Sequence, residues 1–185
     1  MANTNDRKHF ERLMLKHLDA SYNLALWLLR DASEAQDVVQ VAYMKAFEHF
    51  STFTGGNAAG WILTIVRNTA YNWLNKHKNN NNLISFEEAL HSSQSTSPVT
   101  LYAMNPEEIV SAATSNAQIM ELMESLSIDF REVLFLREIE GYSYKEISEI
   151  TQVSKGTVMS RLSRARGQMR QLITEQERRK KTREL

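Results

Sequence analysis

The chain has 185 residues, of which 42% are hydrophobic and none is cysteine, so it can form packed cores but neither a disulfide framework nor a thiolate metal site. Its 22 lysines and arginines equal its 22 aspartates and glutamates, and this neutral total by itself argues against a nucleic-acid binder. The longest apolar stretches are far too short for a membrane span and the N-terminus has no apolar signal segment, which favours a cytoplasmic protein.

Residues 1–78 are expected to form one helical domain. Apolar side chains recur there at helical spacing, beginning with Phe10, Leu13, Leu18, Leu24 and Leu28. A second helix is predicted to begin near residues 31–33, where Ser33 and Gln36 can form a capping box. A loop at 54–57 then leads to a third helix over about residues 58–76.

Residues 79–105 are predicted to be a flexible polar linker. The segment starts with four asparagines and continues into a stretch rich in serine and threonine. Such a composition buries too little apolar surface to offset the entropy lost on ordering.

Residues 106–175 are expected to form a second helical domain. Asn105 and Pro106 give the signal for a helix start. A further helix is predicted to begin at Ser127 and to end before Gly141, after Ile139. No segment shows a strand pattern of useful length, so the predicted fold class is all-α, with two small helical domains joined by the linker.

A helix-turn-helix is predicted over residues 141–166. Ser143 and Glu146 have the spacing of a capping box at the start of its first helix. Residues 151–153 are too few for anything but a tight turn, and Ser154 can cap a second helix that begins at Lys155.

The second helix of this motif divides into two faces at about 100° per residue. The predicted core stripe consists of Val158, Leu162, Ala165 and Met169. A different face holds polar and basic residues without an acid, namely Thr157, Ser160, Arg161, Arg164 and Gln168. Such a face suits the major groove of DNA, where arginine reads guanine and polar groups touch phosphates. The alternative is an ordinary amphipathic helix with a solvated basic face.

The neutral total hides an uneven distribution of charge. Residues 155–185 contain ten lysines and arginines against three acids, whereas residues 79–126 contain six acids and no lysine or arginine. Opposite charges on separate segments suggest either different partners or an intramolecular masking contact. The sequence allows three alternatives for the basic tail, residues 176–185: a phosphate contact, a helix extension or a frayed end.

Three segments in order resemble the extracytoplasmic-function (ECF) group of bacterial sigma factors, which contain only −10-binding and −35-binding domains. DASEAQDVVQVAYMKAFEHF (31–50) is similar to the helix that docks such factors on RNA polymerase. FTGGNAAGWILTIVRNTAYNWLNKHK (53–78) is similar to the segment that melts and reads the −10 element, and FREVLFLREIEGYSYKEISEITQVSKGTVMSRLSRAR (130–166) to the −35-reading domain.

The resemblance implies roles for individual residues. The polymerase-docking face comprises Asp37, Gln40, Val41 and Lys45. The −10 strand is contacted by Asn57, Arg67, Asn68, Tyr71, Asn72 and Lys76. The −35 element is contacted by Lys155, Thr157, Ser160, Arg161 and Arg164, with Arg166 and Arg170 assigned to phosphates.

The loop before the third predicted helix departs from the family pattern. Many relatives have an arginine after the loop phenylalanine and an acid or serine after the glycine, whereas this chain has Thr54, Gly56 and Asn57. In the family this loop forms the pocket for a −10 base. Because the loop differs here, the sequence does not identify the base that this chain selects.

The resemblance also implies partners: core RNA polymerase, promoter DNA and an anti-sigma factor, which in this family sometimes holds the protein at the membrane. It implies no cofactor, metal or small-molecule substrate. An enzyme is disfavoured because the five histidines have no metal-ligand spacing and no nucleotide-binding or hydrolase motif is present. The alternatives are a stand-alone helix-turn-helix regulator, which would bind promoters without polymerase, and a helical adaptor that binds only proteins.

Overall fold

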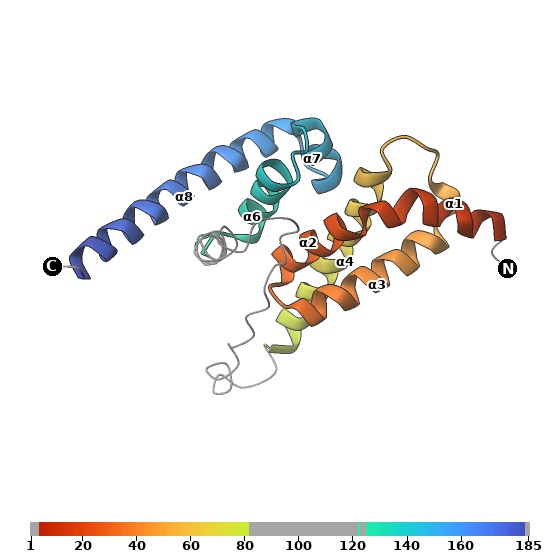
Figure 1. The fold of residues 1–185 in the computed structure, drawn as a ribbon, viewed down its shortest axis with the longest axis horizontal. Helices are drawn as coiled ribbons and strands as arrows, with labels where there is room; N and C mark the ends of the chain where they lie inside the picture. Colours follow the sequence, from red (N-terminus) through yellow and green to blue (C-terminus); the bar gives the residue numbers. More distant parts are fainter. Residues whose placement is uncertain (1–3, 82–121, 123–124, 184–185) are drawn as a thin grey trace, which may run out of the picture.

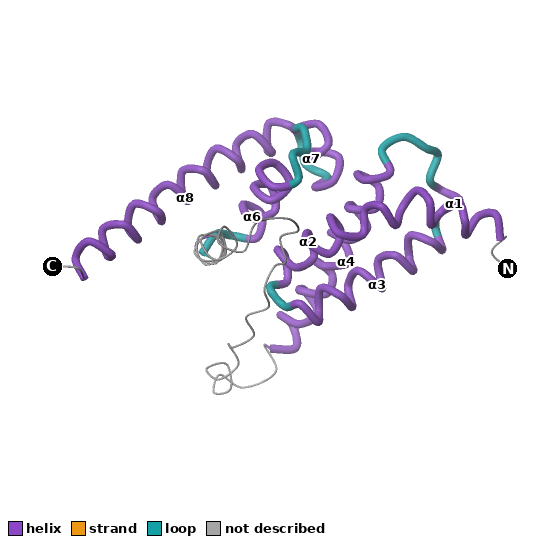
Figure 2. Tube along the Cα trace, viewed as in Figure 1, coloured by secondary structure: helices purple, strands orange, loops and turns teal. Residues whose placement is uncertain are grey.

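The computed structural model describes residues 4–81, 122 and 125–183, and the regular structure in these ranges is helical (Figures 1 and 2). Helices α1 (Thr4–Met14), α2 (Leu18–Leu29), α3 (Ala32–Glu48) and α4 (Ala58–Asn81) form the N-terminal domain. Helices α6 (Ile128–Leu134), α7 (Tyr144–Thr151) and α8 (Lys155–Arg183) form the C-terminal domain. The predicted all-α fold class is confirmed. The linker and the predicted helix start at Asn105 lie outside the described residues, apart from residues 79–81.

The core of the N-terminal domain lies where α2, α3 and α4 pack on one another. Leu24, Ile62 and Leu63 are fully buried there, as apolar residues at helical spacing are expected to be. The Tyr43 hydroxyl, also in this core, donates a hydrogen bond to the Met14 carbonyl (3.1 Å) and lies 3.2 Å from the Ser21 hydroxyl. These partners offset the cost of burying a polar group.

The predicted capping box of Ser33 and Gln36 is wrong. Helix α3 is capped by Asp31, whose carboxylate accepts a hydrogen bond from the Glu34 backbone N–H (2.9 Å). Ser33 is exposed inside the first turn. Aspartate and serine are both good N-caps, and each is followed three residues later by Glu34 or Gln36, so the sequence does not distinguish two candidates that lie two positions apart.

Two predicted boundaries differ from the structure because helices continue through polar sequence. Helix α4 extends through residues 79–81, which the sequence predicts to be part of the linker. Helix α8 extends to Arg183 and so includes most of the predicted tail at 176–185. Of the three possibilities for that tail, a helix extension is the one observed. A polar residue can continue a helix whose preceding turns already supply its hydrogen-bond partners.

The predicted helix-turn-helix is confirmed in detail. The Ser143 hydroxyl accepts a hydrogen bond from the Glu146 N–H (3.3 Å), and the Glu146 carboxylate accepts one from the Ser143 N–H (2.8 Å), which completes the capping box. Gln152 ends α7 in the left-handed conformation (φ 57°), and the Ser154 hydroxyl caps α8 through the Thr157 N–H (3.1 Å). The predicted stripe of α8 faces the core, with Val158, Leu162 and Ala165 buried and Met169 half-buried.

The helix predicted to begin at Ser127 is also observed, although its second half has a different geometry. Helix α6 continues as a π-helical segment, η3 (Phe135–Ile139), and Gly141 follows with a φ of 74°. Val133 and Leu136 are fully buried against the helix-turn-helix.

The two domains are in contact. Helix α4 packs against α7 and α2 packs against α6, and the buried apolar side chains of both domains form one continuous cluster. Across the boundary, the rings of Trp27 and Phe135 have centroids 5.6 Å apart. Within the described ranges, no helix combines the length and apolar character needed to cross a bilayer.

Candidate nucleic-acid interface

The loop before α4 is held by a cluster of aromatic side chains. Phe53 stacks on Phe50, with ring centroids 6.0 Å apart, and contacts Trp61 of α4 at 5.2 Å. Phe50 in turn meets the edge of Phe10 at 5.2 Å. Because these rings fix both ends of the loop, the polar residues between them are presented in a defined position.

The loop itself depends on two glycines. Gly55 and Gly56 have φ values of 93° and 91°, a region that L side chains rarely adopt. Nothing lies within 4 Å of where a Cβ would be at either position. The glycines are therefore required by backbone conformation and not by crowding.

Asn57 is the N-cap of α4. Its side-chain oxygen accepts a hydrogen bond from the Gly60 N–H (3.0 Å), which orients the amide group, while the residue stays exposed. A Cβ at buried Gly60 would lie 3.0 Å from the Asn57 Nδ2, so Gly60 leaves room for this amide. With one oxygen lone pair used for the cap, the amide presents chiefly its NH₂ donors to a ligand.

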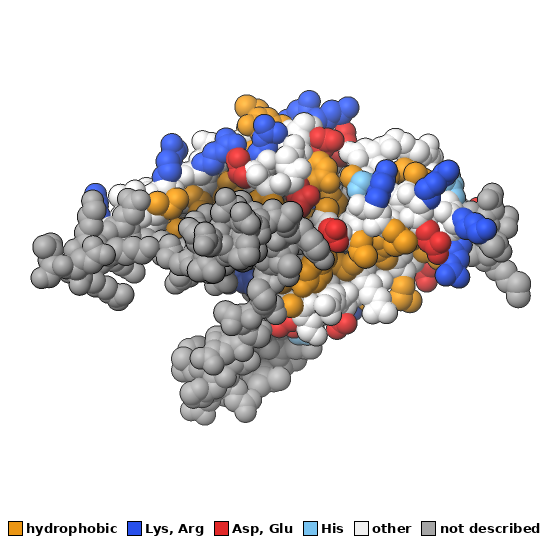
Figure 3. Space-filling view, in the orientation of Figure 1, with side chains coloured by type: hydrophobic (Ala, Val, Ile, Leu, Met, Phe, Trp, Pro, Cys, Tyr) orange, Lys and Arg blue, Asp and Glu red, His pale blue; other side chains and the backbone are white. Residues whose placement is uncertain are grey.

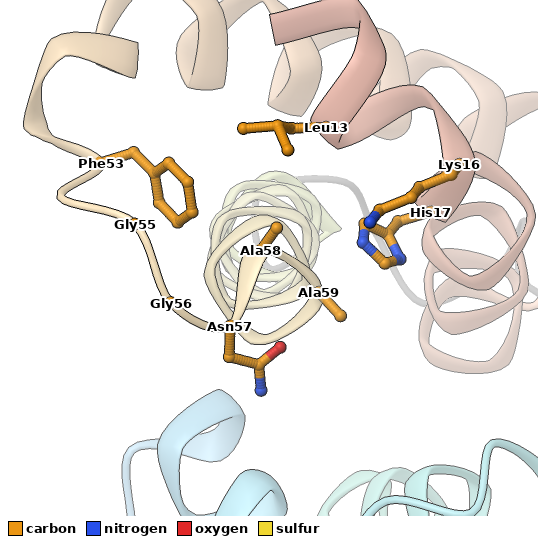
Figure 4. A pocket seen from close by; sticks show the side chains of 9 residues that line it. All are labelled: Leu13, Lys16, His17, Phe53, Gly55, Gly56, Asn57, Ala58 and Ala59. Carbon is orange, nitrogen blue, oxygen red and sulfur yellow. The ribbon is translucent and has the colours of Figure 1, made fainter. Parts of the chain in front are cut away.

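Asn57 lines a pocket of about 350 Å³ (Figure 4). The sequence predicts one of its walls but not the other. The loop supplies one wall, as expected. Another wall consists of Leu13, Lys16 and His17. In Figure 4, Lys16 and His17 lie on the opposite side of the end of α4 from Phe53. Burial and the neighbouring Lys16 ammonium lower the pKa of His17. These three residues lie some forty positions before the loop, so no local sequence pattern could have identified them.

The residues predicted on α4 divide into two groups. Asn57, Asn72 and Lys76 are exposed, as a strand-contacting role requires. Arg67 and Tyr71 instead face α6, and the Asn68 side-chain oxygen accepts a hydrogen bond from Arg67 (3.3 Å). The Arg67 guanidinium donates to the Glu132 carboxylate at 2.6 Å and 3.3 Å and sits 4.3 Å from the centre of the Tyr71 ring.

The predicted −35 face of α8 is largely open. Lys155, Ser160 and Arg164 are exposed and Thr157 is half-buried. Figure 3 shows basic side chains following α8 along its length. The Ser160 hydroxyl donates to the Thr157 carbonyl (2.9 Å), so in this state it is used within the helix.

Arg161 differs from the rest of that face. Its Nη2 lies 3.0 Å from an Asp129 carboxylate oxygen of α6, and only 22% of its side chain is exposed. Helical periodicity predicts that Arg161 shares an exposed face with Arg164. Because α6 packs beside α8, the Arg161 guanidinium instead faces the Asp129 carboxylate. Arg166, predicted to touch phosphates, likewise donates to an acid, Glu138 (2.6 Å), but it stays exposed, as does Arg170.

The predicted polymerase-docking residues share one exposed face of α3. Asp37, Gln40, Val41 and Lys45 all face outward, and Met44 lies among them with 59% of its surface exposed. Val41 and Met44 are therefore exposed apolar side chains on an otherwise polar face. A second apolar surface is a groove between η3 and α8, lined chiefly by Leu134, Ile139, Met169 and Ile173.

Comparisons with known proteins agree with this arrangement. Residues 13–80 match the family model of sigma-70 region 2, and residues 116–169 match that of sigma-70 region 4. The chain is 32% identical over 166 residues to the RNA polymerase sigma-H factor of Pseudomonas aeruginosa, covering 87% of this chain and 84% of that protein. It is 30% identical, with the same coverage, to the ECF RNA polymerase sigma-E factor of Escherichia coli K12.

Among solved structures, the chain is similar to the sigma factor RpoE of Bartonella quintana in complex with the anti-sigma factor NepR. The TM-score is 0.70 at 27% identity, over 90% of this chain and 98% of that one. CnrH in complex with the cytosolic domain of CnrY has a TM-score of 0.60 at 19% identity, over 91% of this chain and 90% of that chain, and supports the fold alone. Since both sigma-70 regions match in order and relatives at 30% identity or more are covered over most of their length, the chain belongs to the ECF group of bacterial RNA polymerase sigma factors.

Proposed function

We propose a specific division of labour for this sigma factor. The exposed face of α3 binds core RNA polymerase, the loop pocket with α4 binds the melted −10 strand, and α8 reads the −35 duplex. The observation that carries the proposal is that the chain presents a largely apolar pocket that includes Asn57 and Lys16 on one domain and a basic recognition helix on the other. Promoter recognition at two elements requires two such surfaces. The role is one of binding, without a catalytic step or a cofactor.

The loop pocket suits a base that has left the stack. A flipped base needs an aromatic surface and hydrogen bonds to its edge, and the pocket lining includes groups of both kinds, namely Phe53, Asn57 and Lys16. Since the Asn57 amide and the Lys16 ammonium are both donors, we expect the pocket to prefer a base edge rich in acceptors, such as the O2 and O4 of thymine.

A stand-alone regulator is the second candidate function. The exposed face of α3 helps to distinguish it from a sigma factor. A regulator that acts without polymerase has no need for Val41 and Met44, whose surfaces are 43% and 59% exposed beside Asp37. A polymerase bound to this face would cover both apolar side chains, which favours the sigma-factor role.

In vitro transcription tests the proposed function. Purified core polymerase is incubated with a pool of promoter fragments, with and without the protein. Start sites that require both components are expected, and their aligned upstream sequences give the −10 and −35 elements. Binding of duplex DNA by the protein alone, without new transcripts, would instead support the stand-alone regulator.

Asp37→Arg tests the docking face. The substitution is on an exposed position, so the fold is expected to stay intact while polymerase capture in a pull-down falls. Asp19→Arg, at an exposed position of α2, is the matched control and should leave capture unchanged. Equal capture by both variants would remove α3 as the docking surface.

An anti-sigma factor is the further partner that we propose. The similar RpoE structure contains one, and the apolar groove between η3 and α8 gives a surface for a partner helix in this chain. We also propose that the protein acts in the cytoplasm, where the polymerase is. Copurification that recovers polymerase but no small inhibitory protein would argue against the anti-sigma partner.

A further inference from the structure

Met159 is a large apolar side chain that the recognition helix leaves in water. It lies in the second turn of α8, and 56% of its surface is exposed. The buried stripe of the helix runs instead through Val158 and Leu162, so Met159 has no core role. From Lys155 to Thr174 the helix has no acidic residue, and its own surface therefore offers Met159 only neutral and basic neighbours.

The open face of α8 is not the one that periodicity alone predicts. At about 100° per residue, Met159, Ser163 and Ser160 occupy a continuous arc of about 100° outside the core stripe, and all three are exposed. Arg161 lies on the opposite flank, where its Nη2 is 3.0 Å from the Asp129 carboxylate of α6. Because α6 and α8 belong to the same domain, this ion pair does not depend on the boundary between the domains. The part of α8 that is open to a ligand therefore includes Met159 and excludes most of Arg161.

The backbone beside Met159 is bare. Gly156 lies three residues earlier, is exposed and does not have a positive φ. A Cβ at this position would meet only the Ser154 hydroxyl oxygen, at an ordinary contact distance of 3.7 Å. Neither backbone conformation nor crowding requires a glycine here, although glycine makes a helix less stable than alanine does, and close approach of the backbone to a ligand is a use that glycine serves. Met159 is thus a long apolar side chain beside a surface that a ligand can approach closely.

The chemistry of the major groove indicates which ligand fits. The second helix of a helix-turn-helix places its N-terminal residues against base edges in that groove, and the first turns of α8 lie beside α7 as this geometry requires (Figure 1). The C5-methyl of thymine is the one apolar group that base pairs present there. A methionine is a poor partner for the polar edges, but its flexible and polarisable chain adapts well to an apolar surface. Exposed Lys155 and Arg164 on either side can contact phosphates.

We propose that Met159 reads a thymine of the −35 element through its C5-methyl group. The inference rests on the proposed function, because it requires that α8 enters the −35 duplex. It adds a base to that function, since it makes the helix prefer an A·T pair at the position that Met159 faces. Met159 is then a specificity-determining residue, while Arg161 stays paired with Asp129 in the same domain.

Replacing thymine by uracil in the promoter tests this contact, because the two bases differ only in the C5-methyl group. Holoenzyme assembled from core polymerase and the full chain is bound to a promoter fragment selected by polymerase-dependent transcription. Each thymine of its −35 element is replaced by uracil, one at a time and on either strand. At one position we expect the replacement to weaken binding about fourfold, the usual effect of losing one buried methyl-sized group.

Met159→Ala gives the matching change in the protein. The variant is expected to bind the thymine promoter at least about fourfold less tightly than the unaltered chain, and to bind the thymine and uracil promoters equally. Met159→Leu keeps an apolar side chain of similar size and should retain the preference for thymine. Gln171→Ala, at an exposed position farther along α8, is the control and should bind as the unaltered chain does.

Gly156→Ala gives an independent readout of the close approach. Alanine is the better helix former, so the Tm is expected to rise or stay the same. The added methyl group faces the proposed DNA side, so binding of the holoenzyme to the promoter should weaken. Unchanged binding by this variant would contradict the close approach that a contact between Met159 and a thymine methyl requires.

The outcomes separate Met159 from the proposed function. Uracil without effect at every −35 position, or an equal effect of uracil in the unaltered chain and in Met159→Ala, would overturn the thymine contact. In the second case, Met159→Ala that binds both promoters more weakly would point to a protein partner for this side chain. Holoenzyme whose binding does not depend on the −35 sequence at all would contradict the role of α8 itself, and the thymine contact with it.

Discussion

Asn57 combines a structural and a proposed functional use in one side chain. Its oxygen caps α4 through the Gly60 N–H, and the residue also lines the loop pocket, where its NH₂ group is not used by the cap. An alanine substitution would remove both uses and would not tell them apart, because loss of an N-cap alone costs about 0.5–2 kcal/mol.

Asn57→Asp separates the two uses. Aspartate caps a helix as well as asparagine does, so we expect the free energy of unfolding to change little. The variant lacks the amide donors, and a lost base contact should weaken −10 recognition by about 1–3 kcal/mol. Urea denaturation and transcription from a −10-dependent promoter measure the two effects. Normal transcription by a stable variant would show that this amide does not read the base.

At the scale of an element, the capping box of α7 fixes the start of the helix-turn-helix. Hydrogen bonds from the Ser143 side chain and backbone lower the pKa of Glu146. A carboxyl whose pKa is lower in the folded state stabilises the fold above its unfolded pKa, and this contribution is lost as pH falls through the folded pKa. The stability of the motif should therefore depend on pH.

Ser143→Ala is expected to lower the free energy of unfolding by about 1 kcal/mol at neutral pH, the usual cost of losing a serine cap. Part of this loss of stability comes from the hydrogen bond with the ionised Glu146 carboxylate. The difference in free energy of unfolding between the variant and the unaltered chain should therefore become smaller when the pH falls below the lowered pKa of Glu146. Denaturant unfolding at neutral and acidic pH checks this, with Ser163→Ala at an exposed position of α8 as control. A cost that is the same at both pH values would contradict it.

At the scale of the whole molecule, the domain boundary combines a polar network with an apolar contact. Trp27 of α2 packs on Phe135 of η3, and the Arg131 guanidinium donates to the Trp27 carbonyl (3.3 Å). The Arg67–Glu132 ion pair also spans this boundary, so separation of the two domains as rigid units on binding a partner has to break these contacts.

Trp27 fluorescence should report that separation. On addition of core polymerase, Trp27 loses its contact with Phe135 and becomes more exposed, so its emission is expected to shift to longer wavelength. Because the chain also contains Trp61 and Trp73 and polymerase has its own tryptophans, the shift is read as a difference from the Trp27→Phe variant. An identical change in both proteins would mean that the boundary stays closed on polymerase.

Local sequence determined the helical elements, the helix-turn-helix with its capping box and the core stripe of α8, because each depends on residues within a few positions of one another. The choice of Asp31 over Ser33 as a cap, and the continuation of α4 and α8 through polar residues, were not determined in this way. Only the tertiary structure placed Lys16 and His17 beside the loop and turned Arg67, Tyr71 and Arg161 toward the acids of α6. Periodicity assigns a side chain to a face of its own helix, but its partner is decided by which other helix packs on that face. Those contacts join residues some thirty to sixty-five positions apart.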